Sequence, residues 1–417
     1  MKAVDEGFDE QMAFTSELVR FPSVRGQELT AQDFMSKEMD AKGLSVDRWK
    51  INVEDIENLP GFSPVSISYE NAYNVVGTHR SATQKGHSLI LNGHIDVVPT
   101  GPLDKWTSPP FEPRIENGLM YGRGAGDMKS GLVSCLFALD ALKRIGFRPA
   151  SDVYVQSVIE EEATGNGTLA CLQRGYRADA ALIPEPMECL LMRAEMGIMW
   201  FQVQVQGDPQ HASGGQGAGV NAIEKAFYLV QALKVLEMDW NGLKNEHPEF
   251  KDLPYPVKFN LGQIKGGDWT SSVPAWCHFD MRIGFYPGWN LADVRAKIEA
   301  CIQKAANEDE FLKNNLPKII YNGHQSEGYI LQNAHDVESV LGNSHESVFG
   351  EPLGEFSIPG ATDGRFYSLY ANTPALVYGP KCLSSHGFDE AVDMESVRKT
   401  TQTIALFVAD WCGLETV

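Results

Sequence analysis

Three apolar stretches in the first half of the chain each end in acidic residues or histidine. They read SLILNGHIDVV at 88–98, VYVQSVIEEE at 153–162 and ADAALIPEP at 178–186. A helical segment, GLVSCLFALDALKRIGF, lies between the first two. This alternation is typical of a mostly parallel sheet between helices, an α/β fold. Such sheets bind ligands at the carboxyl ends of their strands, so we expect these polar groups to converge there.

The pattern changes at Met196, where GIMWFQVQVQG alternates like an antiparallel strand with one exposed face. Further strands and amphipathic helices follow at 258–268, 275–285, 221–238 and 290–308. The α/β pattern returns after Glu327. We therefore predict a catalytic domain built from 1–192 and 327–417. An α+β domain of two helices on an antiparallel sheet would be inserted at 193–326, as a dimerisation or lid domain.

Charge and composition exclude several classes of protein. The net charge of −20, without a Lys/Arg cluster, argues against nucleic-acid binding. No apolar run reaches the roughly 18 residues of a membrane span, and the first residues lack a signal-peptide pattern. Seven scattered cysteines without a CxxC pair favour a reducing compartment. We expect a cytoplasmic protein that binds neither nucleic acid nor membrane.

The stretch from Ser88 to Ser130 contains the first candidate metal ligands. His94 and Asp96 project to the same side of a strand, and the glycine-rich loop GRGAGDMKSG brings Asp127 to the start of a helix. We interpret His94 and Asp127 as metal ligands and Asp96 as the residue that holds His94. A phosphate-binding loop would need glycine directly before the Lys-Ser pair, where this chain has Met128. A dinucleotide-binding fingerprint would need GxGxxG, whereas this loop is GxGxG followed by Asp127.

Glutamates after the next two strands, and a histidine near the C-terminus, extend this set. Among Glu160, Glu161 and Glu162, one carboxylate could bind a metal and another carry a proton. Glu185 stands between two prolines, and His386 follows the last predicted strand. The alternatives are a solvated run of charge, an ordinary strand-end glutamate and structural histidines.

Seven motifs in this order complete the pattern: GHIDVVP, GRGAGDMKSG, EEEATGNGT, IPEP, GDPQHAS, ATDGRF and SSHGFDE. Together they resemble the dinuclear-zinc amidohydrolase family of acetylornithine deacetylase, succinyl-diaminopimelate desuccinylase, aminoacylase and glutamate carboxypeptidase. The resemblance runs nearly end to end. It implies a homodimeric amide hydrolase with two divalent metal ions. Zinc is the expected metal, with cobalt or manganese as alternatives.

The resemblance also implies roles for individual residues. One metal would be bound by His94, Glu185 and Asp127, and the other by His386, Glu162 and Asp127. Glu161 matches the general base, and Asp96 the acid beside the first histidine. His211 matches a histidine that stabilises the oxyanion across the dimer interface. Arg282 and Arg365 match arginines that hold the substrate carboxylate.

Departures from the family pattern leave the substrate open. Ser271 replaces a common asparagine, Gly364 replaces a common alanine, and the segment 53–69 is distinctive. We predict cleavage of an amide C–N bond in a small N-acyl amino acid or similar carboxylate, through a metal-activated water. The alternatives are a dipeptide or peptide C-terminus, a formylated aminopyrimidine, and release of an aromatic amine. A non-catalytic metal-binding protein would lack the base or a ligand, and the sequence contains all of them.

Overall fold

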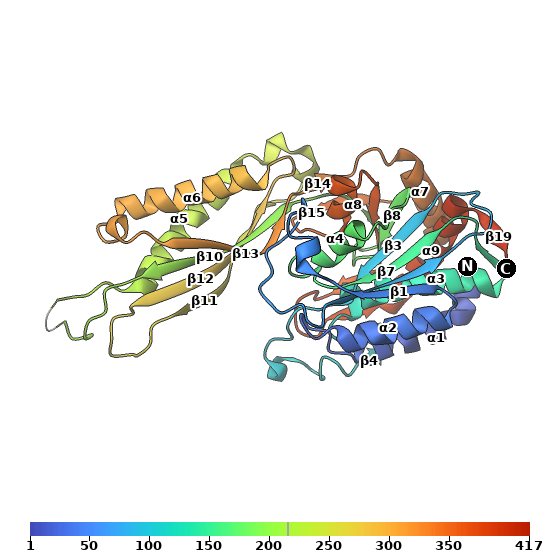
Figure 1. Ribbon diagram of the computed structural model, residues 1–417, viewed down its shortest axis with the longest axis horizontal. Helices are drawn as coiled ribbons and strands as arrows, with labels where there is room; N and C mark the ends of the chain where they lie inside the picture. Colours follow the sequence, from blue (N-terminus) through green and yellow to red (C-terminus); the bar gives the residue numbers. More distant parts are fainter. Residues whose placement is uncertain (215–216) are drawn as a thin grey trace.

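The computed structural model describes residues 1–214 and 217–417, which form two parts joined end to end (Figure 1). The larger part contains a six-stranded sheet. Its strands, in spatial order, are β1 (Ser45–Lys50), β2 (Tyr73–His79), β7 (Val153–Val158), β3 (Leu89–His94), β8 (Ala180–Ile183) and β16 (Ala375–Val377). Strand β2 pairs antiparallel with both neighbours, so the other five strands share one direction. The prediction of a mostly parallel α/β domain is confirmed.

Helices enclose this sheet and share one hydrophobic core with it. They are α1 (Lys2–Val19), α2 (Leu29–Ala41), α3 (Ser130–Arg144), α4 (Asn166–Gln173), α7 (His335–Phe349), α8 (Gly364–Tyr370) and α9 (Met394–Cys412). Helix α3 packs against both α1 and α9. Most of its residues are buried, as expected for a helix that is apolar on nearly all sides. The turn at Ala125–Lys129, which contains Asp127 and leads into α3, is therefore anchored to a buried helix.

Short strands at the edges join distant segments. They are β4 (Arg114–Glu116), β5 (Leu119–Tyr121), β6 (Phe147–Pro149), β9 (Leu191–Glu195), β14 (Tyr329–Ile330), β15 (Glu355–Ile358), β17 (Cys382–Leu383), β18 (Ala391–Asp393) and β19 (Leu414–Thr416). Single 3-10 turns occur at Val53–Asp55, Leu103–Lys105, Lys244–Glu246, Pro248–Phe250 and Leu312–Asn314. The pairing of β5 with β18 is the one that matters for the site. It brings the glycine-rich loop beside the C-terminal segment that contains His386.

The smaller part is a four-stranded antiparallel sheet with two helices on one face (Figure 1). Its elements are β10 (Gly197–Gln206), β11 (Phe259–Gly266), β12 (Trp276–Phe285), β13 (Lys318–Ser326), α5 (Ala222–Gly242) and α6 (Leu291–Glu308). Alternate residues of β10, such as Phe201 and Val203, are buried in a second hydrophobic cluster, while Trp200 and Gln202 are half-buried on the other face. Because this cluster is separate, we propose 193–326 as the inserted domain.

Two expectations from the local sequence differ from the structure. The apolar runs NVVGTHR at 74–80 and SLILNGHIDVV at 88–98 follow each other along the chain and predict neighbouring strands, but β7 lies between β2 and β3. The acidic, proline-containing segment 51–70 predicts a loop and an edge strand, whereas it forms a 3-10 turn and loops, and the edge strand is β1. Pro60 and Pro64 lack the N–H groups that a sheet ladder needs.

No helix among the described residues is both long and apolar enough to cross a bilayer. All seven cysteines have free thiols.

Candidate active site

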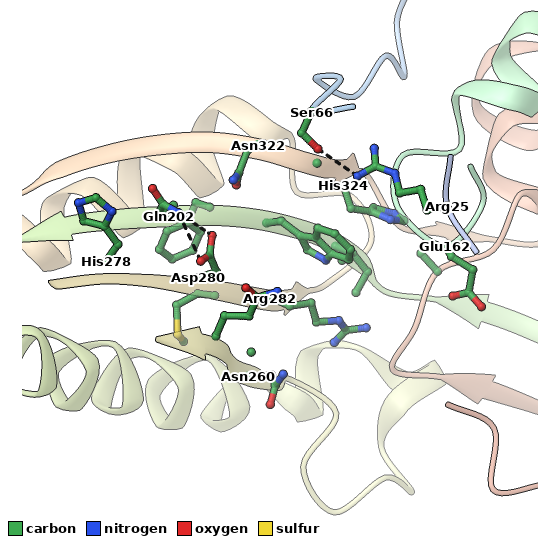
Figure 2. A pocket seen from close by; sticks show the side chains of 18 of the residues that line it. Arg25, Ser66, Glu162, Gln202, Asn260, His278, Asp280, Arg282, Asn322 and His324 are labelled. Carbon is green, nitrogen blue, oxygen red and sulfur yellow. Dashed lines mark hydrogen bonds between the residues drawn. The ribbon is translucent and has the colours of Figure 1, made fainter. Parts of the chain in front are cut away.

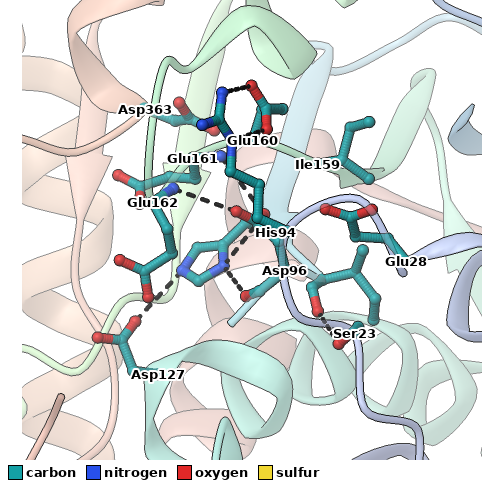
Figure 3. Close-up of polar contacts among 12 residues, drawn as sticks. Ser23, Glu28, His94, Asp96, Asp127, Ile159, Glu160, Glu161, Glu162 and Asp363 are labelled. Carbon is teal, nitrogen blue, oxygen red and sulfur yellow. Dashed lines mark hydrogen bonds and ion pairs between the residues drawn. The ribbon is translucent and has the colours of Figure 1, made fainter. Parts of the chain in front are cut away.

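Polar residues that follow β3, β7 and β8 lie close together, and Figure 3 shows His94, Glu161 and Glu162 among them. His94 is the last residue of β3, Glu161 and Glu162 follow β7, and Glu185 follows β8. Asp127 comes from the turn at Ala125–Lys129 that leads into α3. His386 arrives from the loop after β17, so residues from both halves of the larger domain converge.

The two histidines face the two oxygens of Asp127. His94 Nε2 lies 3.2 Å from Asp127 Oδ1 and 3.6 Å from Glu185 Oε1. His386 Nε2 lies 3.4 Å from Asp127 Oδ2 and 3.0 Å from Glu162 Oε2. A carboxylate placed in this way has the geometry of a bridging ligand. The ligand roles of these five residues remain predictions.

The donor set fits divalent cations. His94 Nδ1 lies 2.8 Å from the main-chain oxygen of Asp96, which can only accept, so Nδ1 is the donor. Nε2 therefore turns a lone pair toward carboxylates unless a proton or cation stands between them. Glu185 Oε1 is buried without a hydrogen-bond partner among the described residues. His94, Glu161 and Glu185, and likewise His94, Asp127 and Glu162, offer ligand atoms within 4.8 Å of one another. Imidazole and carboxylate ligands suit zinc, manganese and cobalt.

The electrostatics of the cluster support the same conclusion. Burial alone would lower the pKa of His94, but the charge of Glu185 and the contact with Asp127 hold it well above the usual value. Hydrogen bonds to Asp127 and Glu162 raise the pKa of His386 to about 11. Burial raises the pKa of Glu185 to about 7. Protons thus balance part of the negative charge, and a bound divalent cation would take their place.

Glu161 lies beside this cluster and is held by its main chain. It is 7% exposed, and burial raises the pKa of its carboxyl well above the ordinary value. Such a carboxyl is a stronger base than one in water. Asp96 accepts hydrogen bonds from the main-chain N–H groups of Glu161, at 3.3 Å, and Glu162, at 3.2 Å. Asp96 contacts His94 Nδ1 through its main-chain oxygen, whereas its side chain lies 3.7 Å from Nδ1. That Asp96 orients His94 stays a prediction.

The sequence reasoning missed an ion pair that supports the Asp127 loop. Glu390 accepts hydrogen bonds from the main-chain N–H groups of Gly124, Gly126 and Asp127 at 3.0, 3.0 and 3.1 Å. It also pairs with Arg123 Nη1 at 2.5 Å, and both side chains are nearly inaccessible. The sequence contained one indication of this pair. Arg123 lies inside the glycine-rich loop, and a charged residue needs a partner of opposite charge when its loop is buried.

Glu160 has a comparable supporting role. Its carboxylate is bound by Arg25, by Tyr69 Oη at 2.7 Å and by Thr164 Oγ1 at 2.9 Å. Arg25 also donates to Ser66 Oγ at 3.0 Å. The distinctive segment 53–69 therefore contributes two side chains beside the catalytic loop, which sequence alone did not assign.

A cleft of about 1420 Å³ separates this cluster from the open face of the second sheet (Figure 2). Glu161, Glu162 and His386 line it on one side. Arg282 lines it on the other and donates from Nη2 to the main-chain oxygen of Pro359 at 3.1 Å. Burial lowers its pKa to about 10, and no carboxylate among the described residues forms an ion pair with it. An anionic group in the cleft would supply the missing partner.

The other two predicted residues lie elsewhere. Arg365 is 1% exposed, and its guanidinium donates to the main-chain oxygens of Thr362, at 2.5 Å, and Thr164, at 3.4 Å. In this conformation it ties α8 to the catalytic loop, and a substrate contact stays a prediction. His211 is exposed, on the segment between β10 and α5, and forms an isolated β-bridge with Ser272. Its Nδ1 accepts from the main-chain N–H of Ser213. His211 is not among the residues that line the cleft, and its contact with the oxyanion stays a prediction.

Comparisons with known proteins agree with this architecture. The model of peptidase family M20/M25/M40 matches residues 90–410. The N-formyl-4-amino-5-aminomethyl-2-methylpyrimidine deformylase of Halalkalibacterium halodurans is 28% identical, over 99% of this chain and 96% of its own. The Bacillus subtilis protein of the same name is 29% identical, over 99% and 97%.

Two solved structures share the whole fold. The dipeptidase Dug1p of Saccharomyces cerevisiae has a TM-score of 0.82 at 15% identity, covering 99% of this chain and 97% of that one. Human carnosine dipeptidase 1 has a TM-score of 0.75 at 13% identity, covering 99% and 98%. At these identities the likeness establishes the fold alone.

Proposed function

Because the chain belongs to peptidase family M20/M25/M40, and is thereby a metal-dependent amide hydrolase, we propose that it removes the formyl group from a small N-formyl amine of the aminopyrimidine type. The observation that carries this proposal is the cluster of His94, Asp127 and Glu162 beside the buried Glu161. Similarity over nearly the full length of two formylaminopyrimidine deformylases supports the choice of substrate.

Two divalent ions, zinc in the first instance, would be held by His94, Glu185 and Asp127 and by His386, Glu162 and Asp127. The distances within each group support this division. Bound ions would lower the pKa of a water molecule and polarise the amide carbonyl.

The protein's own groups would move the proton and position the reactants. Glu161 takes a proton from the attacking water and delivers it to the nitrogen of the leaving amine. Burial keeps this carboxyl basic, and the Asp96 carboxylate holds the main chain of Glu161 by accepting a hydrogen bond from its N–H group. The large cleft admits the amide from the side of the second sheet. His211 of the partner subunit would stabilise the developing oxyanion.

A second candidate is hydrolysis of a dipeptide or an N-acyl amino acid. Arg282 favours it, because a desolvated guanidinium without an acidic partner is suited to a substrate carboxylate. The two candidates share the metal centre and the base, and differ in what occupies the cleft.

A panel of substrates tests these proposals. Metal-free protein reconstituted with zinc, cobalt or manganese is given formylated aminomethylpyrimidine, N-acyl amino acids and dipeptides, and the released amine is measured. We expect the formamide to have the highest kcat/KM and chelation to abolish turnover. Glu161→Gln should lower kcat by at least about 100-fold and still bind metal, because removing a general base costs that much. Glu188→Gln, at an exposed position near Glu185, is the matched control.

Two results would overturn the proposal. Near-full activity in Glu161→Gln or in chelated protein would refute the mechanism. Dipeptides as the best substrates would replace the formamide by the second candidate.

We further propose a cytoplasmic homodimer in which His211 acts across the interface. Mixing inactive His211→Ala with inactive Glu161→Gln, followed by subunit exchange, should restore part of the activity. A hybrid dimer contains one site with both residues intact. No recovery, or a monomer in light scattering, would contradict this arrangement.

A further inference from the structure

Trp200 lies on the face of the antiparallel sheet that lines the cleft, near the start of β10 and so near the connection between the two domains. It lies on β10 opposite Arg282 of β12, and both line the cleft together with Glu161 and Glu162. It is half-buried, on the same face of β10 as Gln202. An indole is thus exposed in the cleft that the catalytic base also faces.

The indole is held in place by a position that only glycine can occupy. Gly323 on β13 has φ +67°, and a Cβ there would lie 2.6 Å from Cε3 of Trp200. The backbone of β13 therefore presses against the six-membered ring. Gln325 Nε2 donates to the main-chain oxygen of Trp200 at 2.8 Å. The ring of His324 stands 6.1 Å away, tilted by 40°. Backing of this kind makes an aromatic side chain a rigid surface.

The rest of this wall is polar but mostly uncharged. The amides of Asn260 and Asn322 line the cleft, while the amide of Gln202 donates from Nε2 to Asp280 Oδ1 at 3.1 Å (Figure 2). Burial, with Arg365 and Arg282 nearby, lowers the pKa of His324 well below its ordinary value, so its imidazole is neutral. Amide groups both donate and accept hydrogen bonds, as the edge of an aminopyrimidine does, where ring nitrogens accept and the amino group donates.

We propose that Trp200 is a specificity-determining residue that stacks against a planar nitrogen heterocycle on the leaving-amine side of the substrate. This inference rests on the proposed function and adds the chemical class that the cleft selects. An aromatic ring gains from contact with the π face of the indole, while a saturated chain of equal size fills the space without that gain. The neighbouring amides would then distinguish a heterocycle from a benzene ring.

Three formamides test the inference: formylated aminomethylpyrimidine, N-formylbenzylamine and N-formylcyclohexylmethylamine. In Trp200→Leu, kcat/KM should fall about tenfold for the two planar substrates, equivalent to about 1.4 kcal/mol, and less than twofold for the saturated one. Trp200→Phe should restore most of the loss. Gly323→Ala should give a smaller selective loss, because the new methyl group displaces the indole.

The matched control is Trp49→Leu. Trp49 lies on β1, away from the cleft, and its indole stacks on Tyr176 with ring centroids 6.0 Å apart. This variant should treat all three formamides as the wild type does. An equal loss for planar and saturated substrates in Trp200→Leu, or the same selective loss in Trp49→Leu, would overturn the proposal.

A binding measurement separates this inference from the proposed function. Calorimetry with metal-free protein and the product amine, aminomethylpyrimidine, needs no turnover. Binding weakened about tenfold in Trp200→Leu supports the stacking site even if the metal-loaded protein hydrolyses none of the formamides. Equal binding by both proteins refutes the stacking site even if the formamides are hydrolysed.

Discussion

Glu390→Gln should destabilise the protein more than any exposed charge substitution, although this residue is no predicted ligand. Its carboxylate accepts from three main-chain N–H groups at 3.0 to 3.1 Å and pairs with Arg123 at 2.5 Å. Both side chains are no more than 2% exposed. Glutamine keeps one accepting oxygen and places an NH2 group where the other stood, so a donor then faces donors.

The magnitude follows from burial. Removing one partner of a buried ion pair costs about 3–5 kcal/mol, because the remaining charge is left uncompensated in a medium of low polarity. Arg123 keeps a hydrogen bond to the main-chain oxygen of Gly387 at 3.0 Å, which favours the lower end of that range. We therefore expect the free energy of unfolding to fall by about 3 kcal/mol. Because the loop also positions Asp127, metal affinity should weaken by about 10- to 100-fold.

Urea unfolding of the metal-free protein measures the first effect, and titration with zinc against a competing chelator measures the second. Glu395→Gln is the control, since Glu395 is exposed on α9 and pairs with Arg398 at the surface. Its effect should stay below about 1 kcal/mol. The reasoning is refuted if Glu390→Gln unfolds at the same urea concentration as the control and binds zinc as tightly as the wild type.

Three further predictions follow from the same contacts. Asp127→Ala should lose both metals while His94→Ala mainly weakens the binding of one, because each Asp127 oxygen faces a different histidine. Metal analysis after dialysis tests this, and an equal loss of metal from both variants would contradict a bridging role for Asp127. Asp96→Asn should lower kcat by about 10- to 100-fold with nearly unchanged metal content, because asparagine lacks one of the two oxygens that accept from the main chain of Glu161 and Glu162. An unchanged kcat would show that Asp96 does not position Glu161. Burial raises the pKa of Glu195 to about 8 from 4.5, so the folded chain holds an extra proton between these values. Stability should therefore fall as pH rises from about 5 to 8, by up to about 1.4 kcal/mol per pH unit, and urea unfolding at several pH values should show a shallower fall in Glu195→Gln.

The sequence by itself determined the fold class and the set of chemical groups. Strand and helix periodicity are local, so β3, β7, β8 and the helix after Asp127 could be recognised without knowing their neighbours. Polar residues at the ends of parallel strands must meet at one edge of the sheet, and therefore His94, Glu162 and Glu185 could be grouped in advance.

The order of the strands in the sheet, and the contacts that hold the Asp127 loop in place, were decided only by the tertiary structure. The insertion of β7 between β2 and β3 depends on pairing between segments about 80 residues apart, which periodicity does not encode. The Arg123–Glu390 pair joins residues 267 positions apart, and the sequence does not indicate which acid would pair with the charge in the glycine-rich loop. Burial turns them into a support for the Asp127 loop.

Individual side chains also show which properties the sequence specifies and which only the folded structure decides. Arg282 and Arg365 carry the same charge and match the same kind of motif, yet one lines the cleft and the other is enclosed by main-chain oxygens. The role of Gly323 under Trp200 likewise depends on how β13 lies against β10. Sequence specifies which groups are present, while the packing of distant segments decides which of them reach a substrate, because burial and distance are properties of the folded chain alone.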